Sequence, residues 1–409
     1  MMKGPASLES PRRVLVVHNR YQQAGGEDVV FEEETRLLEG RGHHVARLVV
    51  DNDDIPQDRS ALISLRLAAS TVWSSAGAAR VRAAVREAGA DIVHFHNTFP
   101  LISPAAYSAA RSEGAAVVQT LHNYRLLCPS ANFYREGRPC EDCLHKPFPW
   151  PGIRHACYRG SRTATATTAA MLGAHHGLRT WTRQVDAYVA LTEFGKEKFV
   201  EGGLPAEKIH VKPNFLNPDP ELGSGRGNYA IFVGRLVHEK GITTLIEAWR
   251  HLEGSIPLKI VGDGPMAEEV KAAAATIPGI EWLGLRPASD VFPLIADAAF
   301  LVFPSQWYEG FGLAMVEAMA VGTPVVASDL GAMQTVVEHG RTGLLFAAGD
   351  SSDLTRTVKH LWSAPEILVP MRHEARRCYE RWYTADQNYR MLMDIYDSAL
   401  RCRVSRRAA

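Results

Sequence analysis

The sequence predicts an α/β protein with two doubly wound, Rossmann-like domains that face a central cleft. Three observations lead to this class. Strand-like and helix-like stretches alternate along both halves of the chain, which is the pattern of parallel sheets with helices on both faces. A segment rich in Pro, Gly and Asn, residues 217–228, separates the halves. The length of 409 residues gives room for about two or three domains of ordinary size.

The first half alternates apolar runs with amphipathic stretches. The run RRVLVVH, residues 12–18, is typical of a buried strand, and a Gly-Gly turn leads from it into a helical pattern over residues 27–42. Further strands are predicted at residues 43–50, 91–96, 115–122, 186–191 and 208–213. Helices are predicted around residues 76–89, 103–114, 162–184 and 192–203.

The second half repeats the alternation. Strands are predicted at residues 229–234, 258–262, 280–284, 299–305 and 324–328. Helices are predicted at residues 242–252, 266–276 and 288–297, with one more from about Leu313. No internal repeat of a length typical of solenoids is visible, so two globular units are expected.

The stretch EGFGLAMVE, residues 309–317, carries a glutamate at each end of an apolar run. Its glycines are poor helix formers, so the sequence predicts a loop that holds Glu309 and then a helix that carries Glu317 on its second turn. Open α/β sheets bind ligands at the carboxyl ends of their strands, where Glu309 falls. The two carboxylates are expected to bind one ligand at two points. The alternative is a helix N-terminal carboxylate and a solvated glutamate.

Two further loops carry groups suited to an anion. Gly25 and Gly26 follow the first strand, and glycine lets the backbone of a helix N-terminus approach a phosphate closely. Arg235 and Lys240 flank the loop after residues 229–234. There a guanidinium can bind a diphosphate through two hydrogen bonds, and an ammonium acts as a point charge. Ordinary turn glycines and solvated cations are the alternatives.

Several well-known signatures do not occur in the sequence. No G-x-G-x-x-G follows a strand, no G-x-x-x-x-G-K-[ST] occurs and no G-x-S-x-G elbow is present. Their absence disfavours a nicotinamide dehydrogenase, a P-loop kinase or ATPase, and a hydrolase with that elbow. The 45 basic residues balance the 45 acidic ones, so the composition does not indicate a partner made of nucleic acid.

At this point the residues resemble a known family. The segments VGRLVHEKG, GDGP and EGFGLAMVEAMAVGTPVVAS, with the Gly-Gly loop after the first strand, resemble family 4 retaining glycosyltransferases of the GT-B fold over nearly the whole chain. The resemblance implies an N-terminal acceptor-side domain over residues 1–212 and a nucleotide-sugar-binding domain over residues 213–385. A terminal helix, residues 386–409, would then pack back toward the first domain.

The resemblance also implies roles in a donor site. Arg235 and Lys240 would hold the diphosphate as catalytic groups. Glu309 would bind sugar hydroxyls, and His122 would lie next to the transferred sugar. These two residues would also be catalytic groups. Glu317 would take the ribose hydroxyls. The remaining donor-binding residues expected from the family are Gly25, Gly26, Gly262, Leu285, Arg286, Gly310, Phe311, Gly312 and Leu313.

The implied reaction is transfer of a sugar from a UDP- or GDP-linked donor to a glycan or lipid-linked acceptor. Such hexosyltransferase chemistry would serve bacterial cell-surface polysaccharide or glycolipid synthesis. An Arg–Lys pair can stabilise the departing diphosphate, so no cofactor is required. Front-face attack and a covalent intermediate both remain open. Two other functions also remain open: a sugar-nucleotide epimerase of the same fold and a non-catalytic subunit that binds a nucleotide sugar.

Histidines end several predicted strands of the first half. His94 is expected to be structural, because its position within a strand implies burial. His96 and Asn97 open a loop and are candidates for contact with the acceptor. This expectation rests on their place at a strand end.

Four of the six cysteines cluster in an insertion over residues 124–160. A C-x2-C pair with two further thiols can form a tetrahedral structural zinc site. The alternatives are four reduced thiols or a redox pair. The four candidate ligands are Cys128, Cys140, Cys143 and Cys157.

Charge is unevenly distributed along the chain. Residues 1–212 carry 26 basic and 22 acidic groups, whereas residues 213–409 carry 19 and 23. No Asp or Glu occurs between Cys143 and Val185, or within residues 59–86. Basic stretches with apolar neighbours either lie on an anionic membrane surface or are solvated helix faces. No signal peptide and no long apolar window is evident, so a cytoplasmic protein is expected, with peripheral attachment to the inner membrane face left open.

Overall fold

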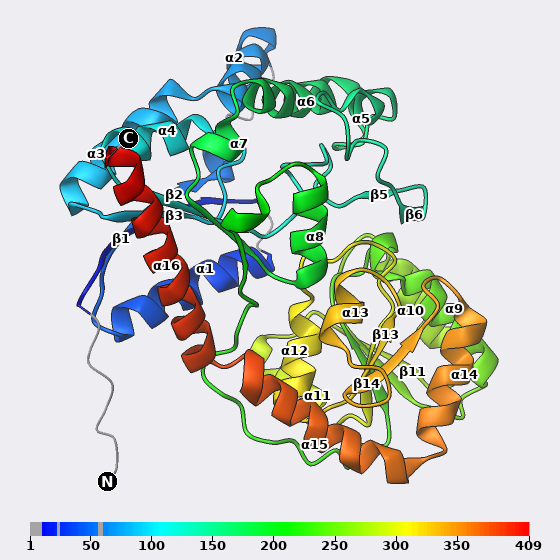
Figure 1. The fold of residues 1–409 in the computed structure, drawn as a ribbon. Helices are drawn as coiled ribbons and strands as arrows, with labels where there is room; N and C mark the ends of the chain where they lie inside the picture. The colour runs from blue at the N-terminus through cyan, green and yellow to red at the C-terminus, as the bar shows by residue number, and fades with distance from the viewer. Residues whose placement is uncertain (1–9, 23–24, 56–59, 409) are drawn as a thin grey trace, which may run out of the picture.

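The computed structural model describes residues 10–22, 25–55 and 60–408 of the chain. The described residues form two lobes, each built on a six-stranded sheet (Figure 1). Every strand pair within the two large sheets is parallel. The predicted α/β class with two doubly wound units is therefore confirmed.

The N-terminal sheet has the strand order β2-β1-β3-β4-β7-β8. Its strands are β1 (Arg13–Arg20), β2 (His44–Asp51), β3 (Ile92–Phe95), β4 (Ala116–Leu121), β7 (Ala187–Ala190) and β8 (Ile209–Val211). The C-terminal sheet has the order β11-β10-β9-β12-β13-β14. Its strands are β9 (Ala230–Val233), β10 (Leu258–Val261), β11 (Ile280–Gly284), β12 (Phe300–Phe303), β13 (Val325–Ser328) and β14 (Gly343–Phe346).

Each sheet is buried on both faces, which explains why its strands read as continuous apolar runs. Successive side chains of a strand point to opposite faces. In β1, Leu15 and Val17 belong to one apolar cluster, and Val14 and Val16 belong to another. In β9 the adjacent residues Ile231 and Phe232 likewise belong to different clusters of the second lobe.

Helices cover the four sheet faces. Those of the N-terminal lobe are α1 (Gly26–Gly40), α2 (Ala61–Val72), α3 (Ser75–Ala88), α4 (Ala105–Ser112), α5 (Trp150–Arg154), α6 (Arg162–Gly177), α7 (Thr180–Arg183) and α8 (Glu193–Glu201). The C-terminal lobe has α9 (Ile242–Leu252), α10 (Ala267–Thr276), α11 (Ala288–Asp297), α12 (Leu313–Ala320), α13 (Ala332–Val336), α14 (Ser351–Trp362) and α15 (Pro365–Trp382).

One predicted helix is wrong in its extent. Residues 162–184 do not form one helix, because α6 ends at Gly177 and α7 starts at Thr180. Between them Arg179 has a φ of 54°, which is left-handed backbone and cannot continue an α-helix. The apolar pattern continues across this break, so periodicity alone gave no sign of it.

The last helix, α16 (Ala385–Ala408), returns to the N-terminal lobe after α15 has crossed the C-terminal lobe (Figure 1). It contacts β4 and β7. Leu392, Met393 and Tyr396 belong to the apolar cluster that also contains Val14 and Val16 of β1. The chain therefore ties its two lobes together twice, through the segment before β9 and through α15 and α16.

Candidate active site

The loops predicted to bind ligand follow strands at two special places. In the N-terminal sheet the strand order reverses between β1 and β3, and in the C-terminal sheet between β9 and β12. Open α/β sheets bind ligands at such reversals. The Gly-Gly loop follows β1, and the loop with His96 follows β3. The loops with Arg235 and Glu309 follow β9 and β12. All four loops therefore flank a reversal point.

Three contacts join the two lobes at the loops that follow β1, β4 and β12. The hydroxyl of Tyr124 donates a hydrogen bond to the Glu309 carbonyl oxygen (3.3 Å). Gly310 passes so close to His122 that a Cβ on the glycine would lie 2.5 Å from the His122 carbonyl oxygen. A Cβ on Gly26 would lie 2.9 Å from the side chain of the first residue of α12, Leu313. The Gly-Gly loop, His122 and the EGFG loop are thus adjacent.

Glu309 and Lys240 form one hydrogen-bonded group. The carboxylate oxygen Oε1 of Glu309 accepts hydrogen bonds from Lys240 Nζ (2.6 Å), Ser305 Oγ (2.6 Å) and Trp307 Nε1 (2.7 Å). Glu309 is only 5% exposed. Its carboxylate is therefore held in one place by three donors, and Lys240 is held beside it. The predicted sugar-binding and diphosphate-binding residues are neighbours rather than separate sites.

Arg235 is exposed in the loop after β9. That loop packs tightly against the G-D-G-P turn after β10. Gly262 has a φ of 142°, and a Cβ there would overlap the carbonyl oxygen of Gly234. The N–H of Leu236 donates to the Asp263 carbonyl oxygen (2.9 Å). Glycine is required at position 262 because two loops meet there. Gly262 would therefore influence donor binding indirectly, by holding the loop of Arg235 in place.

The other residues of the expected donor site differ in accessibility. Leu285 is 77% exposed, and Arg286 Nε donates to the Leu283 carbonyl oxygen (3.0 Å) in the turn after β11. Both side chains are exposed at the carboxyl end of β11. Phe311 is buried, and its ring lies 5.9 Å from that of Tyr383 in the apolar core. Only the backbone of Phe311, between Gly310 and Gly312, is available to a ligand.

Glu317 lies on the second turn of α12, as predicted. The side chain is half-buried. Desolvation raises the pKa of its carboxyl group to about 7. The group is therefore close to half-ionised at neutral pH, and a ligand that hydrogen-bonds the carboxylate form would favour ionisation.

Two histidines extend from the loop after β4 into the N-terminal lobe. His122 Nε2 lies 3.0 Å from His96 Nδ1. His96 Nε2 lies 3.3 Å from an oxygen of Glu34, a buried residue of α1. Desolvation, and then neighbouring histidine charge, lower the pKa of His122 well below its ordinary value. Desolvation likewise lowers the pKa of His96 to about 3, although Glu34 opposes the shift. Both rings are neutral at neutral pH.

His96 Nε2 and Glu34 Oε1 lie close without forming a hydrogen bond, so the charge of the Glu34 carboxylate is what favours one arrangement of the ring protons. A carboxylate beside His96 favours the proton on Nε2, which leaves Nδ1 as an acceptor. His122 then donates from its Nε2 to that acceptor, and its own Nδ1 carries the lone pair. His122 is thereby prepared to accept a hydrogen bond at Nδ1. His96 is 2% exposed, so it reaches the cleft only through His122.

Glu34 is part of a buried ion pair. Lys212 Nζ lies 2.6 Å from Glu34 Oε2, and both side chains are 1% exposed. Burial alone would raise the pKa of Glu34, but the Lys212 ammonium and His94 hold it well below its ordinary value. Within the described residues, Glu34, His94 and His96 are the one group whose potential metal ligands all lie within 4.8 Å of one another. The Lys212 ammonium already neutralises this carboxylate, which disfavours a metal cation there.

The N-terminal lobe contributes residues to this region that the sequence analysis did not identify. Glu27, in the first turn of α1, accepts hydrogen bonds from Asn97 Nδ2 (3.3 Å) and Asn123 Nδ2 (3.4 Å). Burial, and then the charge of Asp28, raise the pKa of Glu27 to about 8. Asn97 also donates to the Asn19 carbonyl oxygen (2.7 Å), so it organises the loop after β3. The sequence feature that could have identified Glu27 is its place directly after Gly25 and Gly26, at the start of a helix that follows a strand.

The insertion brings the four clustered cysteines to one cavity. Cys128, Cys140, Cys143 and Cys157 all line it, and its volume is about 10 Å³. All four are free thiols. The cavity lies within the N-terminal lobe, next to the segment that carries Tyr124.

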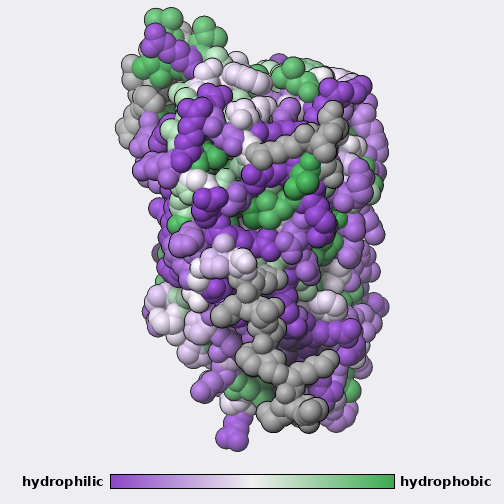
Figure 2. Space-filling model, turned by 60° about the vertical axis from the view of Figure 1, so that its left-hand side comes forward, coloured by the Kyte–Doolittle hydropathy of each residue, from purple (hydrophilic) through white to green (hydrophobic). Residues whose placement is uncertain are grey.

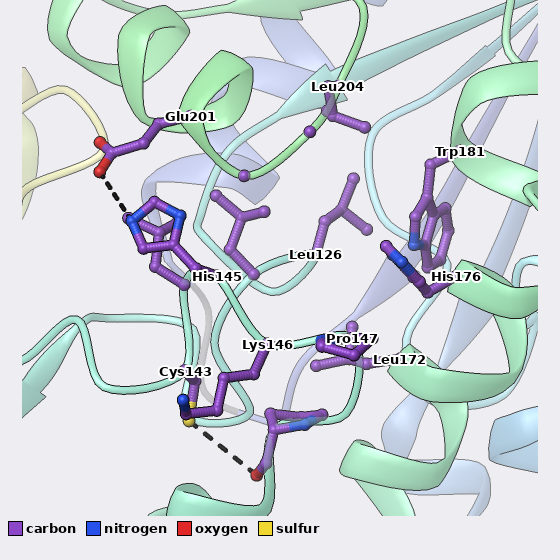
Figure 3. Close-up of a pocket in the computed structure, with 15 residues that line it drawn as sticks. Leu126, Cys143, His145, Lys146, Pro147, Leu172, His176, Trp181, Glu201 and Leu204 are labelled. Atoms are coloured by element: carbon purple, nitrogen blue, oxygen red, sulfur yellow. Dashed lines mark hydrogen bonds and ion pairs between the residues drawn. The ribbon is translucent and has the colours of Figure 1, made fainter.

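A larger pocket of about 270 Å³ lies beside the insertion (Figure 3). Leu126, Leu172, Trp181 and Leu204 give it an apolar wall, and Lys146, His145 and His176 lie around it. His145 Nε2 lies 3.2 Å from a carboxylate oxygen of Glu201. The pocket contains no residue of the C-terminal lobe, so it is distinct from the expected donor site.

Comparison with known proteins identifies both halves of the chain. The family described as Glycosyltransferase Family 4 matches residues 24–220, and the family described as Glycosyl transferases group 1 matches residues 227–364. A phosphatidyl-myo-inositol mannosyltransferase of Mycobacterium leprae is 30% identical over 61% of this chain and 69% of that protein. The amylovoran biosynthesis glycosyltransferase AmsK of Erwinia amylovora is 27% identical over 52% of this chain and 56% of its own length. An uncharacterized glycosyltransferase of Methanocaldococcus jannaschii is matched over 44% of its length, so the chain spans about half the length of the last two relatives.

Solved structures share the fold over nearly the whole chain. Anabaena Alr3699/HepE in complex with UDP and glucose has a TM-score of 0.64 at 17% identity, covering 95% of this chain and 100% of that one. The lipopolysaccharide outer core galactosyltransferase WaaB has a TM-score of 0.65 at 17% identity, covering 94% and 99%. At these identities the likeness establishes the two-lobed architecture.

Proposed function

Because the chain belongs to the group 1 glycosyltransferases of family 4, we propose that it transfers a sugar, with retention of configuration, from a nucleoside diphosphate sugar. The acceptor is a glycan or a lipid-linked glycan in bacterial cell-surface polysaccharide or glycolipid synthesis. One observation carries the proposal. The loop of Glu309, whose carboxylate binds Lys240, contacts the loop of His122 and Tyr124 from the other lobe, beyond the carboxyl ends of β12 and β4.

The donor would lie along the C-terminal side of this junction. Glu317 would accept hydrogen bonds from the ribose hydroxyls, and the exposed turn at Leu285 and Arg286 would contact the base. Arg235 and Lys240 would face the diphosphate, with the N–H groups at Gly25 and Gly26 on its other side. UDP-linked sugars are the first donors to test, because the Anabaena relative is described in complex with UDP and with UDP-glucose.

The chemistry follows from charge and hydrogen bonding. Negative charge accumulates on the diphosphate as the bond to the sugar breaks, and fixed cations lower that barrier. Lys240 is held by Glu309, so it needs little reorganisation to act. His122 presents an acceptor nitrogen to a sugar hydroxyl and so orients the ring. Glu27 and Asn123 line the acceptor side, where a carboxyl group with a raised pKa can exchange hydrogen bonds with an incoming hydroxyl.

The N-terminal lobe is the side that would approach a membrane. None of the helices within the described ranges combines the length and apolar character needed to cross a bilayer. Leu62 and Leu65 of α2 are 71% and 67% exposed. Figure 2 shows hydrophobic and hydrophilic surface side by side at the top of the molecule, where Figure 1 places α2. The basic residues of the acid-free stretch are all exposed: Lys146, Arg154, Arg159, Arg162, Arg179 and Arg183.

The reaction is tested in two steps. Thermal unfolding in the presence of UDP- and GDP-sugars identifies the donor, since a ligand that binds only the folded chain raises Tm. Release of nucleoside diphosphate is then measured with and without candidate acceptors. Transfer predicts release that depends on the acceptor and is lost in Lys240→Ala. Conversion of the donor sugar without any acceptor would identify an epimerase, and binding without turnover across the acceptor panel would favour a non-catalytic subunit.

A further inference from the structure

The insertion between β4 and α6 has little regular structure of its own. Its elements are the short hairpin of β5 (Tyr134–Arg135) and β6 (Arg138–Pro139) and the single turn of α5. Five of its non-glycine residues have a positive φ: Ala131, Phe133, Glu136, Ala156 and Arg159. Such conformations persist only where the surrounding structure holds them. A segment of this kind needs a cross-link or a small core to keep one shape.

The four thiols are where such a cross-link would form. They come from three separate parts of the insertion. Cys140 and Cys143 directly follow the hairpin, Cys128 precedes it, and Cys157 follows α5. All four line the cavity of about 10 Å³, which is the size of a single water molecule or ion. The other two cysteines, Cys378 and Cys402, lie on α15 and α16.

Two of the sulfurs lie beside backbone N–H groups, that of Asp142 for Cys140 and that of Gly152 for Cys143. Burial is the larger influence and raises the pKa of both thiols, so they are protonated in the absence of an ion. The Cys143 thiol itself donates to the Pro149 carbonyl oxygen (3.9 Å). Backbone N–H donors stabilise thiolate charge and orient metal ligands. A C-x2-C loop with such donors is a suitable half of a tetrahedral site.

We propose that Cys128, Cys140, Cys143 and Cys157 bind one Zn²⁺ ion through four thiolates, and that this ion holds the insertion against the active-site cleft. Among the described atoms no three of these sulfurs lie mutually within 4.8 Å. Binding of one ion would therefore require the four thiols, which line the same cavity, to move closer together. The thiol protons are released as the Zn–S bonds form, and no oxidant or reductant is needed.

The site is joined to the cleft by backbone hydrogen bonds. The N–H of Cys128 donates to the Tyr124 carbonyl oxygen (2.9 Å), and the N–H of Cys140 donates to the Phe133 carbonyl oxygen (2.7 Å). Tyr124 in turn bonds the backbone of Glu309, and the Phe133 ring lies 6.1 Å from that of Tyr308. Loss of the ion would loosen both aromatic contacts with the loop that carries Glu309. This consequence for activity rests on the proposed function, whereas the presence of the ion does not.

Metal analysis of the full chain, purified without chelator, tests the proposal. We expect about one zinc ion per chain. Cys143→Ser should lose it, whereas Cys378→Ser, a thiol on α15, should keep it as the matched control. His94→Gln should also keep it, because His94 belongs to the separate Glu34 group. Zinc that survives Cys143→Ser and disappears in His94→Gln would overturn the assignment.

A second test uses only the wild-type chain, so it does not depend on whether a cysteine variant folds. Replacing zinc with Co²⁺ should give sulfur-to-cobalt charge-transfer bands and the visible bands of a tetrahedral ion. Titration with a mercurial should release zinc as four thiols react. Chelation should lower Tm and increase hydrogen exchange in residues 124–160, while the C-terminal lobe stays protected. No zinc after incubation with Zn²⁺, or disulfides in place of thiols, would refute the site.

Discussion

Lys240 and Glu309 are coupled closely enough to act as one unit. Because the ammonium is held 2.6 Å from the carboxylate, Lys240→Ala removes a fixed cation and leaves the buried Glu309 without its counter-charge. We expect turnover to fall by on the order of a hundredfold or more, as loss of one preorganised electrostatic donor typically causes. Steady-state release of nucleoside diphosphate measures this. Lys271→Ala, an exposed lysine on α10, is the control, and equal activity of the two variants would exclude Lys240 from catalysis.

Glu317 should make nucleotide binding depend on pH. Its pKa of about 7 means that lowering the pH below 7 protonates the carboxylate that would accept the ribose hydroxyls. Affinity for the free nucleoside diphosphate is expected to rise with pH through this range. Glu317→Gln should bind more weakly and lose the dependence, whereas Glu309→Gln should bind the nucleotide but transfer poorly. Calorimetry at several pH values separates them, and equal losses of nucleotide affinity would refute the division of roles.

The same shift has a consequence for stability in the absence of ligand. The folded-state pKa lies above the ordinary value of 4.5, so between about 4.5 and 7 the folded chain keeps a proton that the unfolded chain has lost. Stability contributed by this group therefore falls as pH rises through that window. In the wild-type chain, nucleotide affinity and stability therefore respond to pH in opposite directions, and Glu317→Gln should remove both dependences.

At the scale of elements, the EGFG loop and the loop that carries His122 are in backbone contact. A Cβ at position 310 would lie 2.5 Å from the His122 carbonyl oxygen, and backbone cannot move aside as a flexible side chain can. Gly310→Ala should push the lobes apart at the site and lower turnover by about a hundredfold, with little change in Tm. Gly40→Ala, where a Cβ meets open space, is the matched control. Wild-type turnover in Gly310→Ala would mean that this contact is absent during the reaction.

The Glu34–Lys212 pair joins α1 to the segment after β8, and Lys212 also donates to Asn388 of α16 (3.2 Å). Glu34→Gln leaves a buried ammonium unpaired, and we expect it to destabilise the N-terminal lobe by about 3–5 kcal/mol. The double variant Glu34→Gln, Lys212→Met should recover part of that loss. Glu374→Gln breaks an exposed contact with Arg341 and should change stability little, because surface ion pairs are screened by solvent. Urea unfolding measures all three, and similar losses for Glu34→Gln and Glu374→Gln would contradict the burial argument.

At the scale of the whole molecule, the basic surface of the N-terminal lobe should bind anionic membranes. Arg82 is left out of this surface, because its Nε lies 3.6 Å from Glu113, directly after α4, and is already partly neutralised. Arg66, Arg162 and Arg179 are exposed. At about 1 kcal/mol for each basic residue, replacing these three with glutamine should weaken liposome binding by on the order of a hundredfold.

Sedimentation with anionic liposomes at low and high salt measures this binding, which should fall as ionic strength rises. Nucleotide affinity should not change in the triple variant. Arg250→Gln with Lys271→Gln, two substitutions on the C-terminal lobe, is the control and should bind liposomes like the wild type. If the wild-type chain does not bind even at low salt, the basic stretches are solvated faces and the acceptor need not be a lipid.

The sequence by itself determined the two α/β halves and the loops that end their strands. These features depend on local properties: the burial of whole strands, the 3.6-residue period of helices, and glycines that end one element before the next. The loop at Glu309 and the helix that carries Glu317 belong to this class. So does the cysteine cluster, whose members lie within 30 residues of one another in the sequence.

Only the tertiary structure decided which groups meet. Lys240 and Glu309 are 69 positions apart, and Glu34 and Lys212 are 178 apart. The line from Glu34 through His96 to His122 crosses α1 and the ends of β3 and β4. The protonation of these histidines depends on how deeply their rings are buried, which no local sequence pattern specifies. Side-chain pairing between distant segments follows from how sheets and helices stack, and that stacking is set by the summed packing of both lobes rather than by any one stretch of residues.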